Sequence, residues 1–336
     1  MLKKIVTFTL LLALLMGLAA CAGQTADIAD PEESGQDETP EAEIIIPPQN
    51  IGNFEFTPQN YPKLAGSLAA LPLGQAFTAA ALNISRQETA QYIIFEGSTT
   101  DNYRGLISGD FDILLAYEPS EEALRLAKES NFTWEMTPIG RDALVFIVNK
   151  ANPLQDISGA QIRGIYSGKI TTWEELGGPV NSWEKLLGRN AGIIAYQRNK
   201  DSGSQTLFDK LIGLGDDLMK PPSDTIIGSM IGLLEVVSDY DNSINALGYT
   251  VFYYLTNMEP DKLSRTKILS VNGVECNNDT IRSGAYPYVN DFYAVIPANL
   301  PADAPARVLY NWICSAQGAE LAERENYVAL KKTEGI

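Results

Sequence analysis

Residues 193–212 of the chain have the sequence IIAYQRNKDSGSQTLFDKLI. The first four residues are apolar and predict a buried strand, and the last ten have the apolar spacing of a helix. Arg198 lies in the loop between them, and the helix starts at Ser202, Gly203 and Ser204. The start of a helix presents free backbone N–H groups and partial positive charge. This segment therefore predicts a strand–loop–helix unit that can bind an anion.

Short apolar runs and helix-period stretches alternate along the rest of the chain. Strands are predicted at residues 92–95, 113–116, 144–148, 193–196 and 293–296. Helices are predicted at residues 72–84, 102–108, 121–129, 203–212, 228–240 and 304–324. This alternation predicts an α/β fold with largely parallel sheets. Such folds bind ligands beyond the carboxyl ends of strands, often where a helix begins.

Two further places have small hydroxyl residues between a strand-like run and a helix. Ser67 follows Gly66 in the first, and Ser98 and Thr99 form part of the second. Each of these residues is either a donor to a bound anion or an ordinary helix N-cap. Arg198 is either a surface charge or a guanidinium that reaches a bound oxyanion with a two-pronged contact.

Composition limits the class of protein. The chain has 336 residues, is 45% hydrophobic and carries a formal net charge of −17. Its length is enough for two domains of ordinary size. An acidic chain without a basic cluster is a poor candidate for binding nucleic acid, and its overall field does not attract an anion. Local donors would have to hold an anionic ligand.

The chain contains no histidine. This excludes Ser-His-Asp hydrolysis, histidine metal sites and histidine general bases. We therefore expect a binding protein and not an enzyme, with no cofactor and no metal. The alternative is a surface hydrolase with Ser98 or Ser202 as the nucleophile, although no histidine is present to activate either serine.

The N-terminal segment 1–21 has the pattern of a lipoprotein signal peptide. Lys3 and Lys4 precede the apolar run Val6–Leu18, and small residues precede Cys21 in the sequence LAAC. We expect a mature protein that begins at a lipidated Cys21, whose two acyl chains attach it to the membrane. The alternatives are a plain secretory signal or a single membrane helix.

The next segment, 22–53, is predicted to be a disordered tether. Residues 22–50 carry eight acids, no bases and several prolines, a composition that does not bury a core. The folded body is expected to begin near Phe54. Its two cysteines, Cys276 and Cys314, either pair in an oxidising compartment or remain as buried thiols.

Several motifs together resemble one family. The chain is similar to the PstS-like phosphate-binding proteins of ABC transporters, which are type II periplasmic solute-binding proteins. The resemblance runs from about Tyr61 to Leu330. The most specific motifs are GKITTW at 168–173 with Gly177-Gly178 and RNKDSGS at 198–204, supported by residues 148–149, 152–153, 246–249 and 283–287.

This resemblance implies a two-lobed α/β fold with mixed, mostly parallel sheets and two crossover hinge strands. Lobe 1 would comprise residues 54–147 and 251–336, and lobe 2 residues 148–250, with crossings at 144–148 and around 248–254. The resemblance also implies a monomeric, extracytoplasmic, membrane-anchored protein. It would capture phosphate or a similar tetrahedral oxyanion between the lobes for an ABC permease. An extracellular sensor or adhesion module with the same fold is the alternative.

The family pattern also implies a set of ligand-binding residues. In lobe 2 these are Arg198, Ser202, Gly203 and Ser204, where the last residue is usually threonine. In lobe 1, Ser98 matches the helix-start serine of the family and has Thr99 beside it. Ser67, followed by Leu68, lies where the family has a threonine.

One position departs from the family pattern. Tyr117 stands where the family has an aspartate that accepts a hydrogen bond from protonated phosphate and so rejects sulfate. The neighbouring Glu118 could take that part. If neither residue does, the resemblance leaves the ligand open between phosphate, another oxyanion and an anionic organic molecule.

Overall fold

The computed structural model describes residues 54–176, 192–238 and 243–330. These residues belong to one compact unit, Ile45–Ile336. The predicted signal peptide, the lipidated Cys21 and the acidic tether lie outside the described residues. None of the helices in the described ranges is both long and apolar enough to span a membrane.

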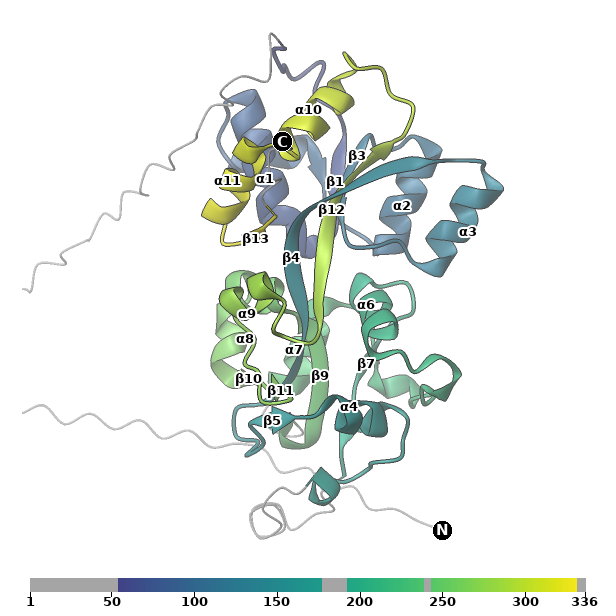
Figure 1. Ribbon diagram of the computed structural model, residues 1–336, viewed down its shortest axis with the longest axis vertical. Helices are drawn as coiled ribbons and strands as arrows, with labels where there is room; N and C mark the ends of the chain where they lie inside the picture. Colours follow the sequence, from purple (N-terminus) through teal and green to yellow (C-terminus); the bar gives the residue numbers. More distant parts are fainter. Residues whose placement is uncertain (1–53, 177–191, 239–242, 331–336) are drawn as a thin grey trace, which may run out of the picture. The chain divides into compact units, whose positions relative to one another are not determined.

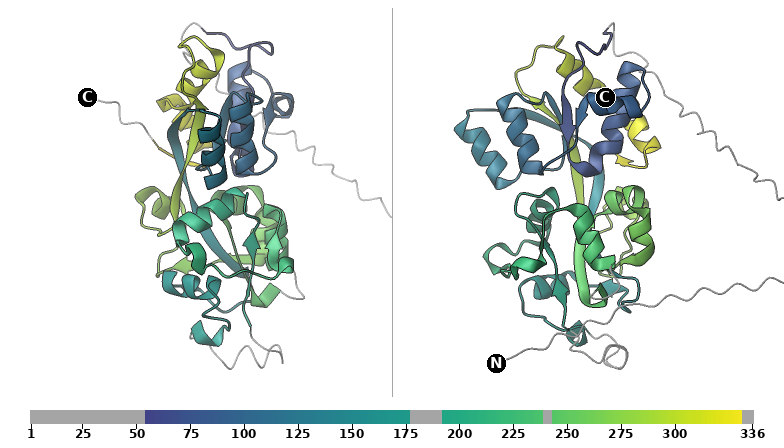
Figure 2. Two further views of the ribbon diagram at one scale, coloured as in Figure 1. Left: turned by 90° about the vertical axis from the view of Figure 1, so that its right-hand side faces the viewer. Right: turned by 180° about the vertical axis from the view of Figure 1, so that it is seen from behind.

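The first lobe is built on a mixed sheet (Figures 1 and 2). Its strands are β1 (Leu64–Gly66), β2 (Ile93–Ile94), β3 (Ile113–Ala116), the first part of β4 (Trp134–Asn149), β12 (Val289–Pro297) and β13 (Val328–Ala329). β1 is parallel to both β2 and β3. β12 lies antiparallel between β3 and β4, and β13 is antiparallel to β4.

The strand β3 is buried on both faces. Ile113 and Leu115 belong to the main hydrophobic core. Leu114 and Ala116 belong to a second cluster, in which Tyr103 also lies. Side chains alternate between the two faces of a strand, so a sheet covered on both sides produces a continuous apolar run. This run is the feature by which the sequence predicted β3.

The long strand β4 passes from the first lobe into the second. Residues 134–143 pair with β12, and residues 144–148 pair with β9 (Ala246–Val251). Just before β12, Tyr288 O accepts a hydrogen bond of 2.9 Å from Leu144 N. β4 and β12 are therefore the two crossover strands. The predicted two-lobed α/β fold is confirmed.

The second lobe combines the rest of β4 with shorter strands. These are β5 (Asp156–Ile157), β6 (Ile194–Ala195), β7 (Gln197–Arg198), β8 (Ile226–Ile227), β9, β10 (Thr266–Ile268) and β11 (Ser270–Val271). β6 is parallel to β9, while β5–β11 and β7–β8 form parallel two-stranded sheets. The sheets are mixed, and the two longest pairings, β4–β12 and β4–β9, are antiparallel.

Helices cover these sheets (Figure 1). The α-helices are α1 (Leu71–Leu82), α2 (Thr99–Ser108), α3 (Glu121–Glu129), α4 (Gly159–Tyr166), α6 (Gly203–Ile212), α7 (Met230–Ser238), α8 (Pro260–Arg265), α9 (Asn278–Ser283), α10 (Pro305–Ile313) and α11 (Ala316–Arg324). The shorter helical turns are η1 (Leu68–Ala70), η2 (Gln87–Gln91), η3 (Glu174–Leu176), η4 (Gly215–Asp217), η5 (Ser223–Thr225), η6 (Ser243–Asn245) and the π-helix η7 (Tyr254–Met258).

The chain returns to the first lobe later than the sequence predicted. We expected 251–336 to belong to lobe 1, with a crossing near 248–254. Tyr253 does contact lobe 1, because its hydroxyl donates to Glu325 O at 2.9 Å. However, β10 then pairs with the end of β4, and β11 pairs with β5. The return is made by β12, so the strands within 251–288 lie with lobe 2.

The core of the second lobe is rich in aromatic rings. Phe146 on β4 packs against Tyr166, Phe208 and Tyr249, with centroid distances of 6.2, 6.4 and 6.3 Å. Phe208 on α6 stacks on Tyr249 of β9 at 4.5 Å. Aromatic pairs of this kind add packing energy to the burial of their area. They fix α6 against β9, and α6 begins at the predicted anion-binding loop.

The two cysteines of the folded body are buried thiols. Cys276 and Cys314 are both buried, and no disulfide joins them. Burial raises the pKa of the Cys276 thiol well above its ordinary value. Of the two alternatives that the sequence left open, two buried thiols without a disulfide describe this structure.

Candidate functional site

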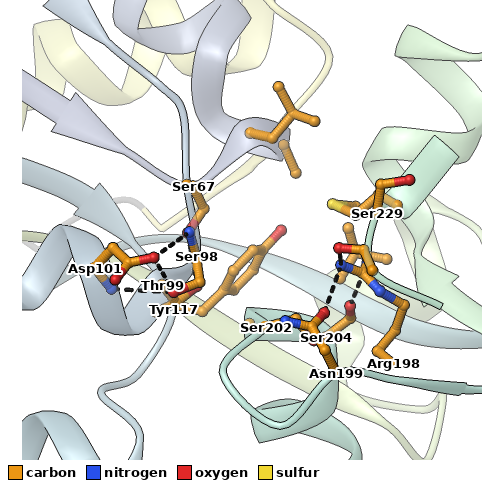
Figure 3. Close-up of a pocket in the computed structure, with 17 residues that line it drawn as sticks. Ser67, Ser98, Thr99, Asp101, Tyr117, Arg198, Asn199, Ser202, Ser204 and Ser229 are labelled. Carbon is orange, nitrogen blue, oxygen red and sulfur yellow. Dashed lines mark hydrogen bonds between the residues drawn. The ribbon is translucent and has the colours of Figure 1, made fainter. Parts of the chain in front are cut away.

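A cavity of about 400 Å³ lies between the two lobes (Figure 3). All the ligand-binding residues predicted from the sequence line it, namely Ser67, Leu68, Ser98, Thr99, Tyr117, Arg198, Ser202, Gly203 and Ser204. The remaining lining residues are Ala69, Gly97, Asp101, Asn199, Gly228, Ser229, Met230 and Val251. The structure thus brings together residues from the starts of η1, α2, α6 and α7.

Arg198 is held in place by the aromatic core of the second lobe. It lies on β7, and only 7% of its surface is exposed. Its backbone N–H donates to the hydroxyl of Tyr249 at 2.9 Å and to Oε1 of Gln205 at 3.2 Å. Because Tyr249 is stacked on Phe208, the hydrophobic packing fixes the point from which the guanidinium extends toward the cavity.

Within the described ranges, the acceptors of the Arg198 guanidinium are all neutral. Its nitrogens donate to Ile227 O at 3.0 Å, Gly228 O at 3.2 Å, Ser204 Oγ at 3.3 Å and Asn199 Oδ1 at 3.4 Å. No ion pair among the described residues includes it. Burial lowers its pKa, yet arginine stays protonated. A buried charge without a counter-charge is costly, and an anion in the cavity would supply one.

The N-terminus of α6 lines the cavity next to Arg198. Ser202 is the N-cap, and its Oγ accepts a hydrogen bond of 3.2 Å from Gln205 N. Gly203 and Ser204 form the first turn, in which backbone N–H groups have no partner within the helix. Ser204 Oγ accepts from the Arg198 guanidinium, so its own proton can be donated elsewhere.

The N-terminus of α2 is closed by a capping box. Ser98 Oγ accepts from Asp101 N at 3.1 Å and donates to Asp101 Oδ2 at 2.7 Å. This hydrogen bond from Ser98 is the main reason why the pKa of Asp101 is lowered. The hydroxyl of Ser98 is therefore engaged within α2. The backbone of the first turn, beginning at Thr99, provides the donors at this end of the cavity.

A pair of buried hydroxyls lies at the end of β1 and the start of α2. Ser67 Oγ is 3.5 Å from Thr99 Oγ1, and both residues are less than a tenth exposed. Ser67 is positioned by its backbone N–H, which donates to Leu115 O at 2.9 Å. Leu68 follows in η1, with 37% of its surface exposed.

The two lobes touch beside the cavity. Thr100 Oγ1 in the first lobe donates to Asp201 O in the second at 3.4 Å. Lys210 Nζ on α6 lies 2.5 Å from Glu118 Oε2, which follows β3. These contacts describe a closed arrangement of the lobes around the cavity.

Tyr117 joins the cavity to a buried carboxylate. Its hydroxyl donates to Asp142 Oδ2 at 2.8 Å. Asp142 is 2% exposed and lies on β4, next to the point where this strand changes its partner from β12 to β9. Burial raises the pKa of Asp142 to about 6, and it raises the pKa of Tyr117 far above its ordinary value.

Two other residues considered in the sequence are not among those lining the cavity. Glu118 accepts from Tyr293 at 3.0 Å and pairs with Lys210, so it does not replace the missing aspartate. Trp173, the last residue of the 168–173 motif, is 2% exposed and packs in the main core.

Sequence reasoning did not find Asp101 or Asp142. Asp101 could have been found, because an acid three residues after Ser98 completes a capping-box pattern. Ser229 also lines the cavity, at the start of the helix predicted over 228–240, and its Oγ accepts a hydrogen bond of 3.0 Å from Gly232 N. Asp142 had no local signal, since only the fold brings it to Tyr117.

A family model and curated relatives match the chain. The model for the PBP superfamily domain matches residues 65–316. The phosphate-binding protein PstS of Staphylococcus aureus (strain USA300) is 25% identical over 240 residues, which is 70% of this chain and 68% of that protein. The protein of the same name from Staphylococcus saprophyticus is 26% identical over 200 residues, which is 58% of this chain and 57% of that protein.

Solved structures share the fold. A putative phosphate ABC transporter substrate-binding protein with bound phosphate from Clostridium perfringens has a TM-score of 0.62 and 22% identity, covering 81% of this chain and 100% of that one. An ABC-type phosphate transport receptor from Vibrio cholerae has a TM-score of 0.57 and 19% identity, covering 80% and 99%. These matches confirm the family resemblance seen in the sequence. With a family model that spans most of its folded residues, the chain belongs to the PBP superfamily.

Proposed function

We propose that this protein captures inorganic phosphate, or a closely related tetrahedral oxyanion, in the cavity between its lobes and delivers it to the permease of an ABC importer. The relatives and the solved structures named above are phosphate-binding or phosphate-transport proteins. The proposal for this chain is supported by its own cavity and by the family to which it belongs.

One observation carries the proposal. Arg198 lies buried at the cavity with a positive charge that no carboxylate among the described residues neutralises. The N-termini of α2 and α6 present backbone donors to the same space. An oxyanion would satisfy the guanidinium and these N–H groups together, and charge-assisted hydrogen bonds are the strong ones.

Anion binding would favour closure of the lobes, because the hydrogen-bond donors come from both lobes. Thr99 and Ser67 belong to lobe 1, whereas Arg198 and Ser202 belong to lobe 2. An anion that needs both sets binds the closed form better than an open form, so it shifts the equilibrium between the two. Micromolar binding corresponds to about 8 kcal/mol, which several hydrogen bonds to a dehydrated anion can supply.

The location and partners form the remaining part of the proposal. The protein would be a monomer on the extracytoplasmic face of the cell membrane, anchored through a lipidated Cys21. The permease would recognise its closed form. Labelling cells with a radioactive fatty acid tests the anchor, because a Cys21→Ser variant should lose the label that the wild-type protein carries.

The binding proposal is tested by isothermal titration calorimetry of the purified protein. We expect one phosphate per chain, micromolar or tighter affinity, and a rise in melting temperature with phosphate concentration. Since the cavity of about 400 Å³ has room beyond one tetrahedral anion, a phosphate monoester and a phosphonate are titrated as well. Absence of binding to every one of these compounds would refute the proposal.

We also propose that the protein is not an enzyme. The hydroxyl of Ser98 donates to Asp101, and Ser202 caps α6. The chain has no histidine that could activate either serine. Incubation with chromogenic carboxylate and phosphate esters should give no turnover, whereas sustained release of the chromophore would contradict this part.

A further inference from the structure

The cavity wall has many donors, and it needs an acceptor to recognise a proton on the ligand. Hydrogen phosphate carries a proton at neutral pH, and sulfate of the same shape and size carries none. A site built only from donors would bind both anions. An acceptor that faces the ligand favours the protonated anion, because opposite sulfate two lone pairs would meet without a hydrogen. Selection of this kind rests on the proposed function, in which the cavity holds a tetrahedral oxyanion.

Tyr117 is placed to be such an acceptor. It follows the end of β3, lines the cavity and is 6% exposed. Figure 3 shows its ring between the residues of the two lobes, with the hydroxyl directed into the space that they enclose. Its backbone oxygen accepts a hydrogen bond of 2.9 Å from Tyr103, which holds the residue in position.

Asp142 determines whether the Tyr117 hydroxyl donates or accepts a hydrogen bond at the cavity. Asp142 Oδ1 accepts from the backbone N–H groups of Ala143 at 2.8 Å and Tyr253 at 3.0 Å, and Oδ2 accepts from Tyr117. At neutral pH the carboxyl is above its pKa of about 6 and is mainly ionised, so it accepts a proton in the hydrogen bond and does not donate one. The Tyr117 proton is therefore committed to Asp142, and a lone pair of the phenol oxygen remains for the ligand.

We propose that the Tyr117–Asp142 pair selects protonated tetrahedral oxyanions over fully ionised ones. Asp142 turns the hydroxyl of Tyr117 into a hydrogen-bond acceptor, which takes the proton of hydrogen phosphate or hydrogen arsenate. The pair supplies what the aspartate supplies in the resembled family, through a tyrosine and a second residue 25 positions further along the chain.

The other nearby carboxylates are already occupied. Asp101 lines the cavity, but its Oδ2 accepts from both N and Oγ of Ser98, and its Oδ1 pairs with Arg104. Glu118 pairs with Lys210 and does not line the cavity. Tyr117 is thus a side chain at the cavity whose proton is committed to a carboxylate that does not itself line the cavity.

The substitution Asp142→Asn reverses this direction with little change of shape. Oδ1 receives two backbone N–H groups, so the oxygen of the asparagine amide stays at that position. Its NH₂ group then faces Tyr117 and donates to it. The tyrosine must turn its own proton toward the cavity, where it becomes a donor that suits sulfate. Tyr117→Phe removes the acceptor without adding a donor.

The experiment compares two matched pairs of anions by calorimetry at neutral pH: phosphate with sulfate, and arsenate with selenate. For the wild-type protein we expect the protonated member of each pair to bind at least about tenfold to a hundredfold tighter. Asp142→Asn should lower both ratios at least about tenfold, with a gain in sulfate affinity. Tyr117→Phe should lower the ratios without that gain. Asp291→Asn, which changes a carboxylate that pairs with Arg141 and does not line the cavity, is the matched control and should leave the ratios unchanged.

The outcomes separate this inference from the proposed function. Wild-type protein that binds none of the four anions would overturn both. Wild-type protein that prefers phosphate, together with unchanged ratios in folded Asp142→Asn and Tyr117→Phe variants, would overturn the inference alone. A ratio that falls only in the control variant Asp291→Asn would also overturn it. Circular dichroism of each variant establishes that it is folded. If Asp142→Asn does not fold, Tyr117→Phe alone tests the inference.

Discussion

A Cβ atom added to Gly203, in the first turn of α6, would lie 2.4 Å from Oγ1 of Thr99, in the first turn of α2. The two residues belong to different lobes and both line the cavity. The backbone of the second lobe thus comes into direct contact with a side chain of the first. Only glycine permits an approach this close, and the contact exists only while the lobes are closed.

We predict that Gly203→Ala weakens phosphate binding without unfolding the protein. The added methyl group has to displace Thr99 Oγ1 or hold the lobes apart. Either change makes the closed form less stable relative to the open form. The expected loss is about tenfold in affinity, or about 1.4 kcal/mol. Calorimetry measures the loss, and thermal unfolding without ligand should change little. Gly192→Ala, where the nearest atom is Thr171 O at 3.9 Å, is the control, and an equal loss there would contradict the explanation.

The lobe-2 part of the site could be predicted from the sequence because it is local. Arg198 and Ser204 stand within one strand–loop–helix segment, and apolar spacing alone placed α6 at 203–212, as observed. The helices α3 and α6 have the predicted bounds. The predicted helix 304–324 is two helices, because Ser315 caps a new one with its hydroxyl accepting from Gly318 N.

The remainder could not be predicted because it depends on distant parts of the chain. Nothing near Tyr117 in the sequence points to Asp142, since their contact arises only when β3 and β4 lie in one sheet with β12 between them. In the same way, β10 lies with lobe 2 because it pairs with the distant strand β4. Apolar patterns show that a strand is buried, and they carry no information about which strand lies beside it.

Arg198→Ala is predicted to lower phosphate affinity at least about a hundredfold, because a charge-assisted contact to the anion is worth about 3 kcal/mol. Arg198→Lys keeps a positive charge but loses the planar set of donors that reaches Ile227 O, Gly228 O and Ser204 Oγ together. It should bind with intermediate affinity. Calorimetry on folded variants decides this, and wild-type affinity in Arg198→Ala would refute the assigned site.

The ion pair between Lys210 and Glu118 is predicted to contribute a little to closure. It joins the lobes, but both side chains are substantially exposed, and such pairs are worth about 0.2–1 kcal/mol. Glu118→Gln should therefore weaken phosphate binding by no more than about fivefold, and added salt should reduce the difference. Glu122→Gln, which breaks a pair with Arg125 inside α3, is the control and should leave affinity unchanged. A larger loss in Glu122→Gln than in Glu118→Gln would show that closure is not the cause.

The stability of the protein is predicted to depend on pH through Asp142. Burial raises the pKa of this carboxyl in the folded protein to about 6, from an ordinary value of 3.8. The folded state therefore binds the proton more tightly than the unfolded state does. The contribution of Asp142 to stability is fully present below 3.8, and it is lost as the pH rises through 6. The loss amounts to about 2–3 kcal/mol.

Asp142→Asn removes this titratable group, so a comparison of the variant with the wild-type protein isolates its contribution to stability. The other titratable groups that interact with Asp142 are Tyr117, Tyr253 and Cys276, and burial raises the pKa of each above its ordinary value, so none of them titrates in the same interval. Urea unfolding of both proteins across this pH range should give a difference in unfolding free energy that grows in favour of the variant as the pH rises. Carboxylates with a lowered pKa, such as Glu175, stabilise the folded state as the pH rises. They do so equally in both proteins, so their effect cancels in the difference. A difference that stays constant with pH would mean that Asp142 is ionised throughout, held so by its hydrogen bonds from Tyr117, Ala143 and Tyr253.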